Sequence, residues 1–175
     1  MQNNSAHSSK WIIIDVFIGL PIIVAIIMQL LFPINVSLKG IYNIVSVVFS
    51  CVIFLIGLVI IGFSRKELSI FNQPTDPGYS TEKIVKSGVY SISRNPMNLG
   101  AVLVYFGLGF FLKNIWFLIL LLPTVFLCTQ YLIKPEEKYL KKKFEEEYVQ
   151  YCNSVHRWIC KKQNKNRFTR ENYNE

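Results

Sequence analysis

The chain has 175 residues, of which 51% are hydrophobic and 14% aromatic, and it carries a formal net charge of +8 at pH 7. The apolar residues occur in long blocks instead of being spread among polar ones. This pattern argues against a soluble DNA-binding domain, a disordered chain and a secreted disulfide scaffold. The length leaves room for one domain, so the composition indicates a small membrane protein.

The first two apolar blocks are each long enough to cross a membrane. They cover residues 11–32 and 41–63, and a helix of about 20 residues spans a hydrocarbon core of roughly 30 Å. The first block follows a short polar leader with one lysine, which is also how a signal peptide begins. We expect a retained membrane helix instead, because the block is too long for a signal peptide and no small-residue cleavage site follows it.

A third apolar stretch, residues 99–133, is interrupted by Lys113 and Asn114. The interruption predicts a tight hairpin of two helices, 99–112 and 115–133. At 1.5 Å per residue the first of these measures about 21 Å, which is short for a full span. We therefore predict an all-α fold: a polytopic membrane helical bundle of about four transmembrane helices, the last two forming the hairpin.

Lysine and arginine residues are concentrated in two segments, and their positions predict the orientation in the membrane. Residues 64–98 contain five and the tail after residue 133 contains eleven, whereas each of the other two connections has a single lysine. The positive-inside rule then places both termini and the 64–98 segment in the cytoplasm. The basic charge also favours contact with anionic lipid, and no nucleic-acid-binding motif accompanies it. We expect a lipid bilayer as partner and no nucleic acid.

The segment 64–98 is predicted to be an irregular loop with a functional role, because it is long and its residues 73–79 are rich in turn formers. At its end, Pro96 fits the first turn of the next helix, where its missing N–H costs nothing. Ser93 or Asn95 could cap that turn. Polar groups at a helix N-terminus can hold an anionic group.

A cytoplasmic amphipathic helix of about 25 residues is predicted after the hairpin. Pro135 followed by Glu136 and Glu137 is typical of a helix start. We expect the helix to lie against the membrane or to fold back onto the bundle. Its apolar residues recur at spacings of three and four and form one face: Leu140, Phe144, Tyr148, Tyr151, Val155 and Trp158.

Arg94 and the acidic pair Glu136 and Glu137 flank the two ends of the predicted hairpin. A short hairpin returns its ends to within about 10 Å of each other, so these residues should share one cytoplasmic interface. A guanidinium suits a carboxylate, and a glutamate accepts from hydroxyl or amino groups. The pattern indicates a site for a small zwitterionic or nucleoside ligand. The alternative is that Arg94 marks topology and that the acids match a helix dipole.

Several short motifs in this half of the chain occur together, in order, in one known superfamily. With the apolar hairpin between them, they resemble the isoprenylcysteine carboxyl methyltransferases and phospholipid methyltransferases over roughly residues 65–160. Asn95 and Asn98 depart from the usual pattern, which generally has histidine (in the carboxyl methyltransferases) and tyrosine there. The motifs are Gly88-Val89-Tyr90, Arg94-Asn95-Pro96-Met97-Asn98-Leu99-Gly100, Glu136-Glu137 with Leu140, Phe144 with Tyr148 and Tyr151, and Arg157-Trp158-Ile159.

The resemblance implies an integral membrane methyltransferase that uses S-adenosyl-L-methionine without a Rossmann domain. The sequence agrees, because no G-x-G-x-x-G follows a predicted strand. No metal is expected. The implied domains are the N-terminal transmembrane helices 1 and 2 (1–63), the methyltransferase core (64–160) and a disordered basic tail (161–175). The implied site residues are Arg94 and Arg157 as catalytic, Gly88, Tyr90, Asn95, Pro96, Asn98, Gly100, Glu136 and Glu137 as cofactor-binding, and Tyr148 and Tyr151 as substrate-binding.

The methyl acceptor is expected to be a lipophilic molecule, either a membrane lipid or a lipidated substrate. An acceptor carboxylate needs no base, whereas a phospholipid amine must lose a proton, and His156 is the one evident histidine for that task. These considerations favour carboxylate O-methylation, as in isoprenylcysteine. The alternatives are phospholipid amine N-methylation, and a non-catalytic or reductase-like membrane protein of the same fold. The sequence makes no prediction of the oligomeric state.

Overall fold

The computed structural model describes residues 19–34, 39–73 and 81–159 of the chain. These residues form helices and no β-strand, which confirms the all-α prediction. The predicted start of the first helix, residues 11–18, and the predicted tail, 161–175, lie outside the described residues. The elements in chain order are α2 (Leu20–Leu31), α3 (Ile41–Ile70), the 3₁₀ helix η2 (Gly88–Ser91), α4 (Pro96–Phe111), α5 (Ile115–Cys128), the π-helical turn η3 (Thr129–Ile133) and α6 (Lys134–Ser154).

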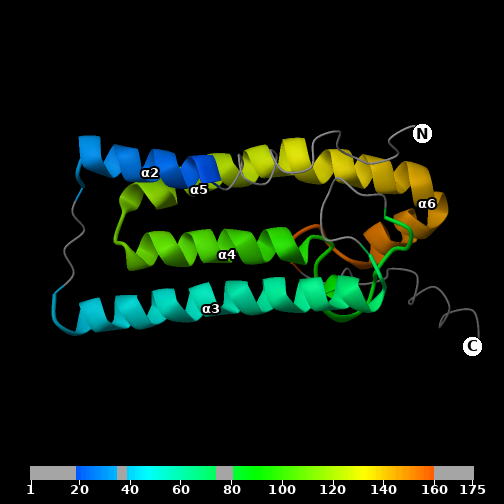
Figure 1. Cartoon of the computed structure of the whole chain (residues 1–175), viewed down its shortest axis with the longest axis horizontal. Coiled ribbons are helices and arrows are strands. Elements are labelled where there is room, and N and C mark those ends of the chain that lie inside the picture. The colour runs from blue at the N-terminus through cyan, green and yellow to red at the C-terminus, as the bar shows by residue number, and fades with distance from the viewer. Residues whose placement is uncertain (1–18, 35–38, 74–80, 160–175) are drawn as a thin grey trace, which may run out of the picture.

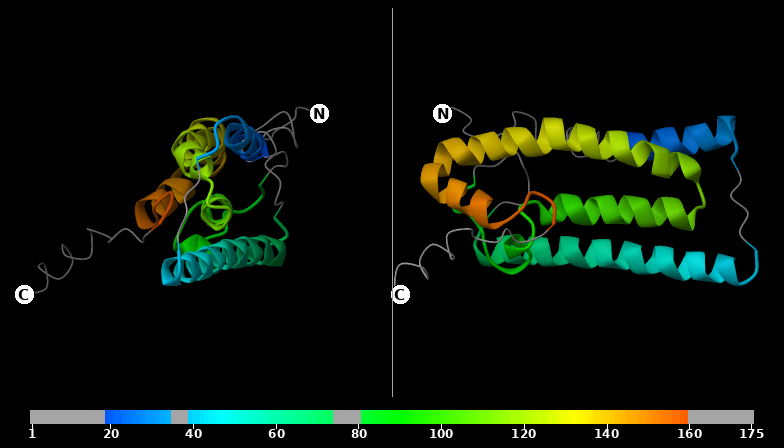
Figure 2. Two further views of the ribbon diagram at one scale, coloured as in Figure 1. Left: turned by 90° about the vertical axis from the view of Figure 1, so that its left-hand side faces the viewer. Right: turned by 180° about the vertical axis from the view of Figure 1, so that it is seen from behind.

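The long helices lie side by side in the order α3, α4, α5, α2 (Figures 1 and 2). Helix α4 contacts both α3 and α5, and α2 packs along α5. The α4–α5 turn lies at one end of the bundle, with the end of α2 and the start of α3. At the opposite end lie the end of α3, the η2 turn, the start of α4 and all of α6. The second end collects the polar residues discussed below.

Helices α3 and α4 approach closely because glycines face each other across their contact. A Cβ atom added to Gly57 would lie 2.7 Å from the carbonyl oxygen of Gly100, and one added to Gly100 would lie 2.8 Å from that of Gly57. Further along α4, Gly107 meets the backbone of Phe54 in the same way. Small residues of this kind let two helix backbones pack without intervening side chains.

The outer surface of the bundle is strongly apolar. Leu30 on α2 and Leu122 on α5 are 77% and 78% exposed, and many other large apolar residues on α2, α3 and α5 are also exposed. Two stretches are long and apolar enough to cross a membrane, α3 and the continuous helix Ile115–Ser154, whereas α2 and α4 are shorter. An apolar exterior of this extent indicates contact with lipid. The predicted count of four crossings and their orientation stay predictions.

Helix α3 is longer than predicted. It continues to Ile70 instead of ending at Phe63, and it includes the charged residues Arg65, Lys66 and Glu67. These residues are good helix formers, so charge ends the apolar stretch without ending the helix. The irregular segment therefore begins at Phe71, and the prediction of a loop from residue 64 is wrong for its first part.

The predicted helix start at Pro135 is confirmed, because α6 begins at Lys134 with this proline and the two glutamates in its first turn. Helix α5 runs into α6 without a break through the π-helical turn Thr129–Ile133. Proline has no N–H, and its ring collides with the carbonyl four residues earlier, here that of Tyr131. Tyr131 lies inside the π turn, whose hydrogen bonds reach one residue further than in an α-helix, so the turn can accommodate Pro135.

Helix α6 bends sharply and ends earlier than predicted. Glu145 has φ +42° and ψ −114°, and the chain leaves helical geometry at Val155. The second half of α6 thus turns back toward the bundle, as Figure 1 shows, which confirms the predicted fold-back. The predicted apolar face divides between two clusters. Tyr148, Tyr151 and Val155 pack with Ile84, Leu140 and Phe144, whereas Trp158 packs against Cys128, Leu132 and Ile133.

The close α3–α4 contact can be tested with two alanine substitutions in one helix. Gly57→Ala should lower the free energy of unfolding by about 1–3 kcal/mol, because the added methyl group must push the backbone of α4 away. Gly62→Ala is the matched control, since no atom lies within 4 Å of the position of its Cβ. The measurement is thermal unfolding in detergent. Equal midpoints for the two variants would contradict the close contact.

Candidate functional site

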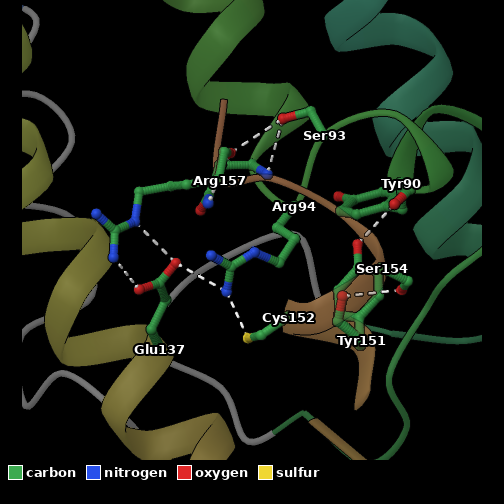
Figure 3. A network of polar contacts seen from close by, with 9 residues as sticks. Tyr90, Ser93, Arg94, Glu137, Tyr151, Cys152, Ser154 and Arg157 are labelled. Atoms are coloured by element: carbon green, nitrogen blue, oxygen red, sulfur yellow. Dashed lines mark hydrogen bonds and ion pairs between the residues drawn. The ribbon is translucent and has the colours of Figure 1, made fainter. Parts of the chain in front are cut away.

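Three chain segments meet at one end of the bundle: the residues before α4, the first turn of α6 and the extended segment after α6. The first and the last of these segments are joined by hydrogen bonds to the backbone carbonyls of the segment after α6. The Arg94 N–H donates to the carbonyl oxygen of His156 at 3.0 Å. The Ser93 hydroxyl and the Asn95 side-chain amide both donate to the carbonyl oxygen of Arg157, at 3.2 and 3.3 Å. Figure 3 shows this junction.

Neither Ser93 nor Asn95 caps α4 with its side chain, so that expectation is wrong. Asn95 occupies the N-cap position but uses its amide to bind Arg157. Ser93 accepts the N–H of Asn95 at 3.1 Å, one residue before the helix begins. Both side chains therefore fasten the tail segment to the start of α4, and Pro96 fills the first helical position as predicted.

Glu137 binds two arginines. Arg157 approaches it with two parallel bonds, Nε to Oε1 at 2.9 Å and Nη2 to Oε2 at 2.5 Å. Arg94 Nη1 lies 3.2 Å from Oε1. The side chains of Arg94 and Glu137 are only 11% and 16% exposed, so water screens this interaction weakly. The predicted meeting of Arg94 with the acidic pair is confirmed, and Arg157 joins them from the tail (Figure 3).

We define the Glu137 cluster as Arg94, Glu137 and Arg157. With two arginines and one glutamate, the cluster has a net charge of +1. Arg94 also has an unused donor, because its Nε is buried without a hydrogen-bond partner within the part of the chain that the structure describes. Its Nη1 contacts the sulfur of Cys152 at 2.5 Å. A surplus cation with a free buried donor is suited to an anionic group of a ligand.

Glu136 is the unpaired acid of the site. Across the described ranges, no hydrogen bond or ion pair reaches its carboxyl group. Burial, and then the neighbouring charge of Glu137, raise the pKa of this carboxyl from 4.5 to about 7. Near neutral pH Glu136 is thus divided between its neutral and charged forms, which makes it available to a cation or a proton.

Three tyrosines enclose the site on the side of the tail. The Tyr151 hydroxyl donates to the carbonyl oxygen of Tyr90 at 2.7 Å, which holds α6 against η2. The rings of Tyr148 and Tyr151 are both buried and meet edge to face, with centroids 6.2 Å apart. The pKa of all three hydroxyls is raised, mainly because the side chains are buried, so they remain neutral phenols.

Gly88 has a clear structural role in the turn beside the site. Its φ is +55°, and an added Cβ would lie 2.7 Å from a carboxylate oxygen of Glu67. The Ser87 hydroxyl donates to the same carboxylate. Glu67 thus fastens the end of α3 to η2. Sequence reasoning missed this residue because it placed position 67 in a loop.

Asn98 and Gly100 lie on different sides of α4. Gly100 faces α3, as described above. Asn98 lines a narrow, mostly apolar groove between α4 and α5. Eight residues line the groove: Asn98, Ala101, Val102, Tyr105, Leu121, Thr124, Val125 and Cys128.

The structure brings most of the predicted site residues to one place. Arg94, Asn95, Glu137 and Arg157 are in direct contact, and the three tyrosines lie beside them. Cys152 was not predicted as a site residue, although a signal existed. It follows Tyr151 directly and lies four residues after Tyr148, so a helix places it on the same side.

Comparison with known proteins gives one family. The family model described as phospholipid methyltransferase matches residues 45–147, more than half of the chain. The matched range runs from α3 into α6 and includes Arg94, Glu136 and Glu137, but it ends before Arg157. No curated protein and no solved structure matches the chain.

The Glu137 cluster can be tested by removing its shared acid. Glu137→Ala leaves two partly buried guanidinium groups without their anion, which should cost about 3 kcal/mol of unfolding free energy. Glu147→Ala is the matched control, because Glu147 pairs with Lys86 at 2.8 Å where both side chains are about half exposed. Such a surface pair contributes about 0–1 kcal/mol. Denaturant unfolding in detergent measures both, and equal losses would contradict the assigned difference.

The raised pKa of Glu136 predicts a pH dependence of stability. The folded protein keeps a proton on this carboxyl between pH 4.5 and about 7, where the unfolded chain has released it. Stability should therefore fall as the pH rises through this window, by at most about 3 kcal/mol for this group. Glu136→Gln should remove that part of the decline. Unfolding free energies at pH 5 and pH 8 test it, and equal declines in both proteins would contradict it.

Proposed function

The chain belongs to the phospholipid methyltransferase family, and from this membership we propose that it is an integral membrane enzyme that transfers the methyl group of S-adenosylmethionine to a lipophilic acceptor. The observation that carries the proposal is the Glu137 cluster, a polar site with a surplus cation at one end of an otherwise apolar bundle. The site and the apolar surface together suit an enzyme that joins a water-soluble cofactor to a lipid.

The residues present fit the methionine end of S-adenosylmethionine, which carries a carboxylate, an ammonium and a sulfonium. The free Nε of Arg94 and the surplus positive charge suit the carboxylate. The unpaired carboxyl of Glu136 suits the ammonium. We assign Glu137 to holding both arginines in place. Gly88, Tyr90, Asn95, Pro96, Asn98 and Gly100 stay proposed cofactor residues by resemblance, with Gly88 and Gly100 also required by packing.

When bound, the cofactor supplies a methyl group that is already activated by the sulfonium. The protein therefore has to align the acceptor and exclude water. Buried Tyr148 and Tyr151 and the segment after α6 cover the site from the tail side. We propose that this cover excludes water from the reacting atoms and that both tyrosines contact the substrate.

We propose a carboxylate oxygen as the methyl acceptor. Arg157 is the more accessible arginine of the cluster, at 33% exposed, and can orient an acceptor carboxylate. In the transfer a C–O bond forms and the C–S bond breaks, and its electron pair stays on sulfur. No proton moves, so the site needs no base for this reaction.

A second acceptor, a phospholipid amine, is supported by one observation. Glu136 has a free carboxyl with a pKa near 7, which is suited to accept a proton at neutral pH. An ammonium headgroup would pass one proton to Glu136, and the freed nitrogen pair would then attack the methyl carbon. The sequence argument against an amine was the lack of a base other than His156, and Glu136 supplies one.

We further propose that the site faces the cytoplasm and that the chain crosses the membrane about four times, with both termini cytoplasmic. The described basic residues support this orientation, because Lys86 and Arg94 pair with Glu147 and Glu137 of α6 and Lys134 begins α6, the helix that lies at the site end of the bundle (Figure 1). At the opposite end the described residues include two lysines, Lys39 just before α3 and Lys113 in the α4–α5 turn, which donates to Asn43 at 2.5 Å.

The proposal predicts binding and transfer that depend on Arg94. The purified protein in detergent should bind S-adenosylmethionine, and Arg94→Ala should weaken binding by about tenfold or more, as expected for a lost charge-assisted hydrogen bond. Lys86→Ala, which removes a surface lysine that pairs with Glu147, is the control and should bind normally. No binding by the wild type would refute the methyltransferase, and selective NADPH binding would favour a reductase-like protein.

The same preparation identifies the acceptor atom. After incubation with membrane lipids and methyl-labelled cofactor, mild alkali should release the label as methanol if a carboxylate has become a methyl ester. Label that stays non-volatile after alkali, bonded to the headgroup nitrogen, would contradict the carboxylate and support the amine. In that case Glu136→Gln should lower kcat and remove its rise with pH, whereas a cofactor-binding role alone would raise KM for the cofactor.

A further inference from the structure

Four exposed lysines lie on one side of the first half of α6. Because an α-helix has 3.6 residues per turn, their spacings place them within about 100° of one another around its axis. The opposite side carries Glu136, Leu140 and Phe144. The last two pack into the cluster around Tyr148, so this side faces the interior. We define the lysine face of α6 by its four members: Lys134, Lys138, Lys141 and Lys142.

The lysine face has no acidic partner within the described ranges 19–34, 39–73 and 81–159. On a regular helix Glu145 would lie one turn after Lys141 and could form an ion pair with it. The break in helical geometry at Glu145 removes this partner. Lys134 Nζ donates to the neutral side chain of Gln130, at 2.7 Å. The face therefore presents four positive charges that no described acid neutralises.

The lysine face begins at the depth where the hydrocarbon core is expected to end. From Ile115, the first residue of α5, to Lys134 the helix rises about 29 Å, close to the roughly 30 Å thickness of that core. Tyr131 lies just before Lys134 and is 61% exposed, and tyrosines are frequent at the boundary between lipid tails and water. Side chains on a helix lean toward its N-terminus, which here is the direction of the membrane. The lysine ammonium groups can thus reach the layer of lipid phosphates.

The charge and the depth of this face suit an anionic phospholipid headgroup. A lysine ammonium on a long, flexible side chain binds phosphate as a point charge. Clusters of four or more basic residues directly beyond a membrane helix are attracted to anionic lipids, and the attraction acts within about one Debye length of the surface. The net charge of the chain alone would spread such attraction over every exposed lysine and arginine, whereas the lysine face concentrates it.

We propose that the lysine face binds the headgroups of anionic phospholipids and that this contact holds the first half of α6 at the membrane surface. The opposite side of the same helix carries Glu136, so the contact also fixes the depth of the candidate site. The bound lipid is a partner and not the methyl acceptor. Methyl transfer plays no part in this contact.

Phosphatidylglycerol is a suitable probe, because its headgroup is anionic but offers neither a carboxylate nor an amine for methylation. In mixed micelles of a non-ionic detergent, displacement of a fluorescent phospholipid measures the mole fraction of each lipid at half-saturation. The wild type should prefer phosphatidylglycerol to phosphatidylcholine by about tenfold or more. The preference should disappear in about 1 M salt, where the Debye length is about 3 Å.

Substitutions within the lysine face test whether its charge carries the preference. Lys138→Gln combined with Lys142→Gln should reduce the preference to about threefold or less, because each lysine near an anionic surface contributes to the attraction. Lys138→Arg combined with Lys142→Arg keeps the charge and should keep the preference. A loss in the arginine variant as large as in the glutamine variant would overturn the proposal.

The matched control removes the same charge from lysines that are already engaged. Lys86 pairs with Glu147 at 2.8 Å, and Lys83 lies over the ring of Phe71. Lys83→Gln combined with Lys86→Gln should therefore keep the preference for phosphatidylglycerol. An equal loss in this control and in the lysine-face variant would show that net charge attracts the lipid, which would overturn the proposal.

The remaining outcomes separate the lysine face from catalysis. Equal binding of the two lipids by the wild type, or displacement of the lipid by a soluble acidic peptide at equal charge concentration, would overturn the proposal. A wild type that prefers phosphatidylglycerol but neither binds S-adenosylmethionine nor transfers a methyl group would support the lysine face and refute the proposed function. Methyl transfer by a protein without the preference would do the reverse.

Discussion

The shared ion pair of Glu137 with Arg94 and Arg157 is the interaction on which the site end of the molecule depends. Its three residues come from the start of α4, the first turn of α6 and the segment after α6. Because both arginines need the same carboxylate, none of these segments can move far without leaving a partly buried charge unpaired. The hydrogen bonds from the Arg94 N–H to the His156 carbonyl and from the Ser93 hydroxyl to the Arg157 carbonyl act in the same direction. The site is thus organised before any ligand arrives.

The rest of the fold obeys a different constraint, set by an apolar environment. Few side chains of the described bundle are buried, and large apolar residues cover its outside. In such surroundings helices associate through close packing instead of through burial of oily surface from water. The facing glycines of α3 and α4 supply that packing. Close packing therefore stabilises the bundle, whereas ion pairs and hydrogen bonds stabilise the site. The two parts adjoin at Asn98, which lies four residues from Arg94 and lines the groove between α4 and α5.

Much of this arrangement could be predicted from the sequence, because it follows from the order of apolar blocks. The break at Lys113 and Asn114 folds α4 and α5 into a hairpin, which brings the start of α4 close to the end of α5. The Arg94–Glu137 contact is a consequence of this hairpin. Other features depend on tertiary contacts that local propensity does not contain. Glu145 adopts a positive φ that no sequence rule assigns to glutamate. Tertiary packing also decides that Cys152 contacts Arg94 and that Glu67 reaches Ser87.

The central claim is that a nucleoside cofactor with a methionine end binds at the Glu137 cluster. Photo-crosslinking of labelled S-adenosylmethionine, followed by peptide mapping, tests its location directly. The account predicts label in peptides that contain residues 90–98, 136–137 or 148–157, and its loss when excess unlabelled cofactor competes. Label confined to the α4–α5 turn around Lys113, at the opposite end of the bundle, would contradict it.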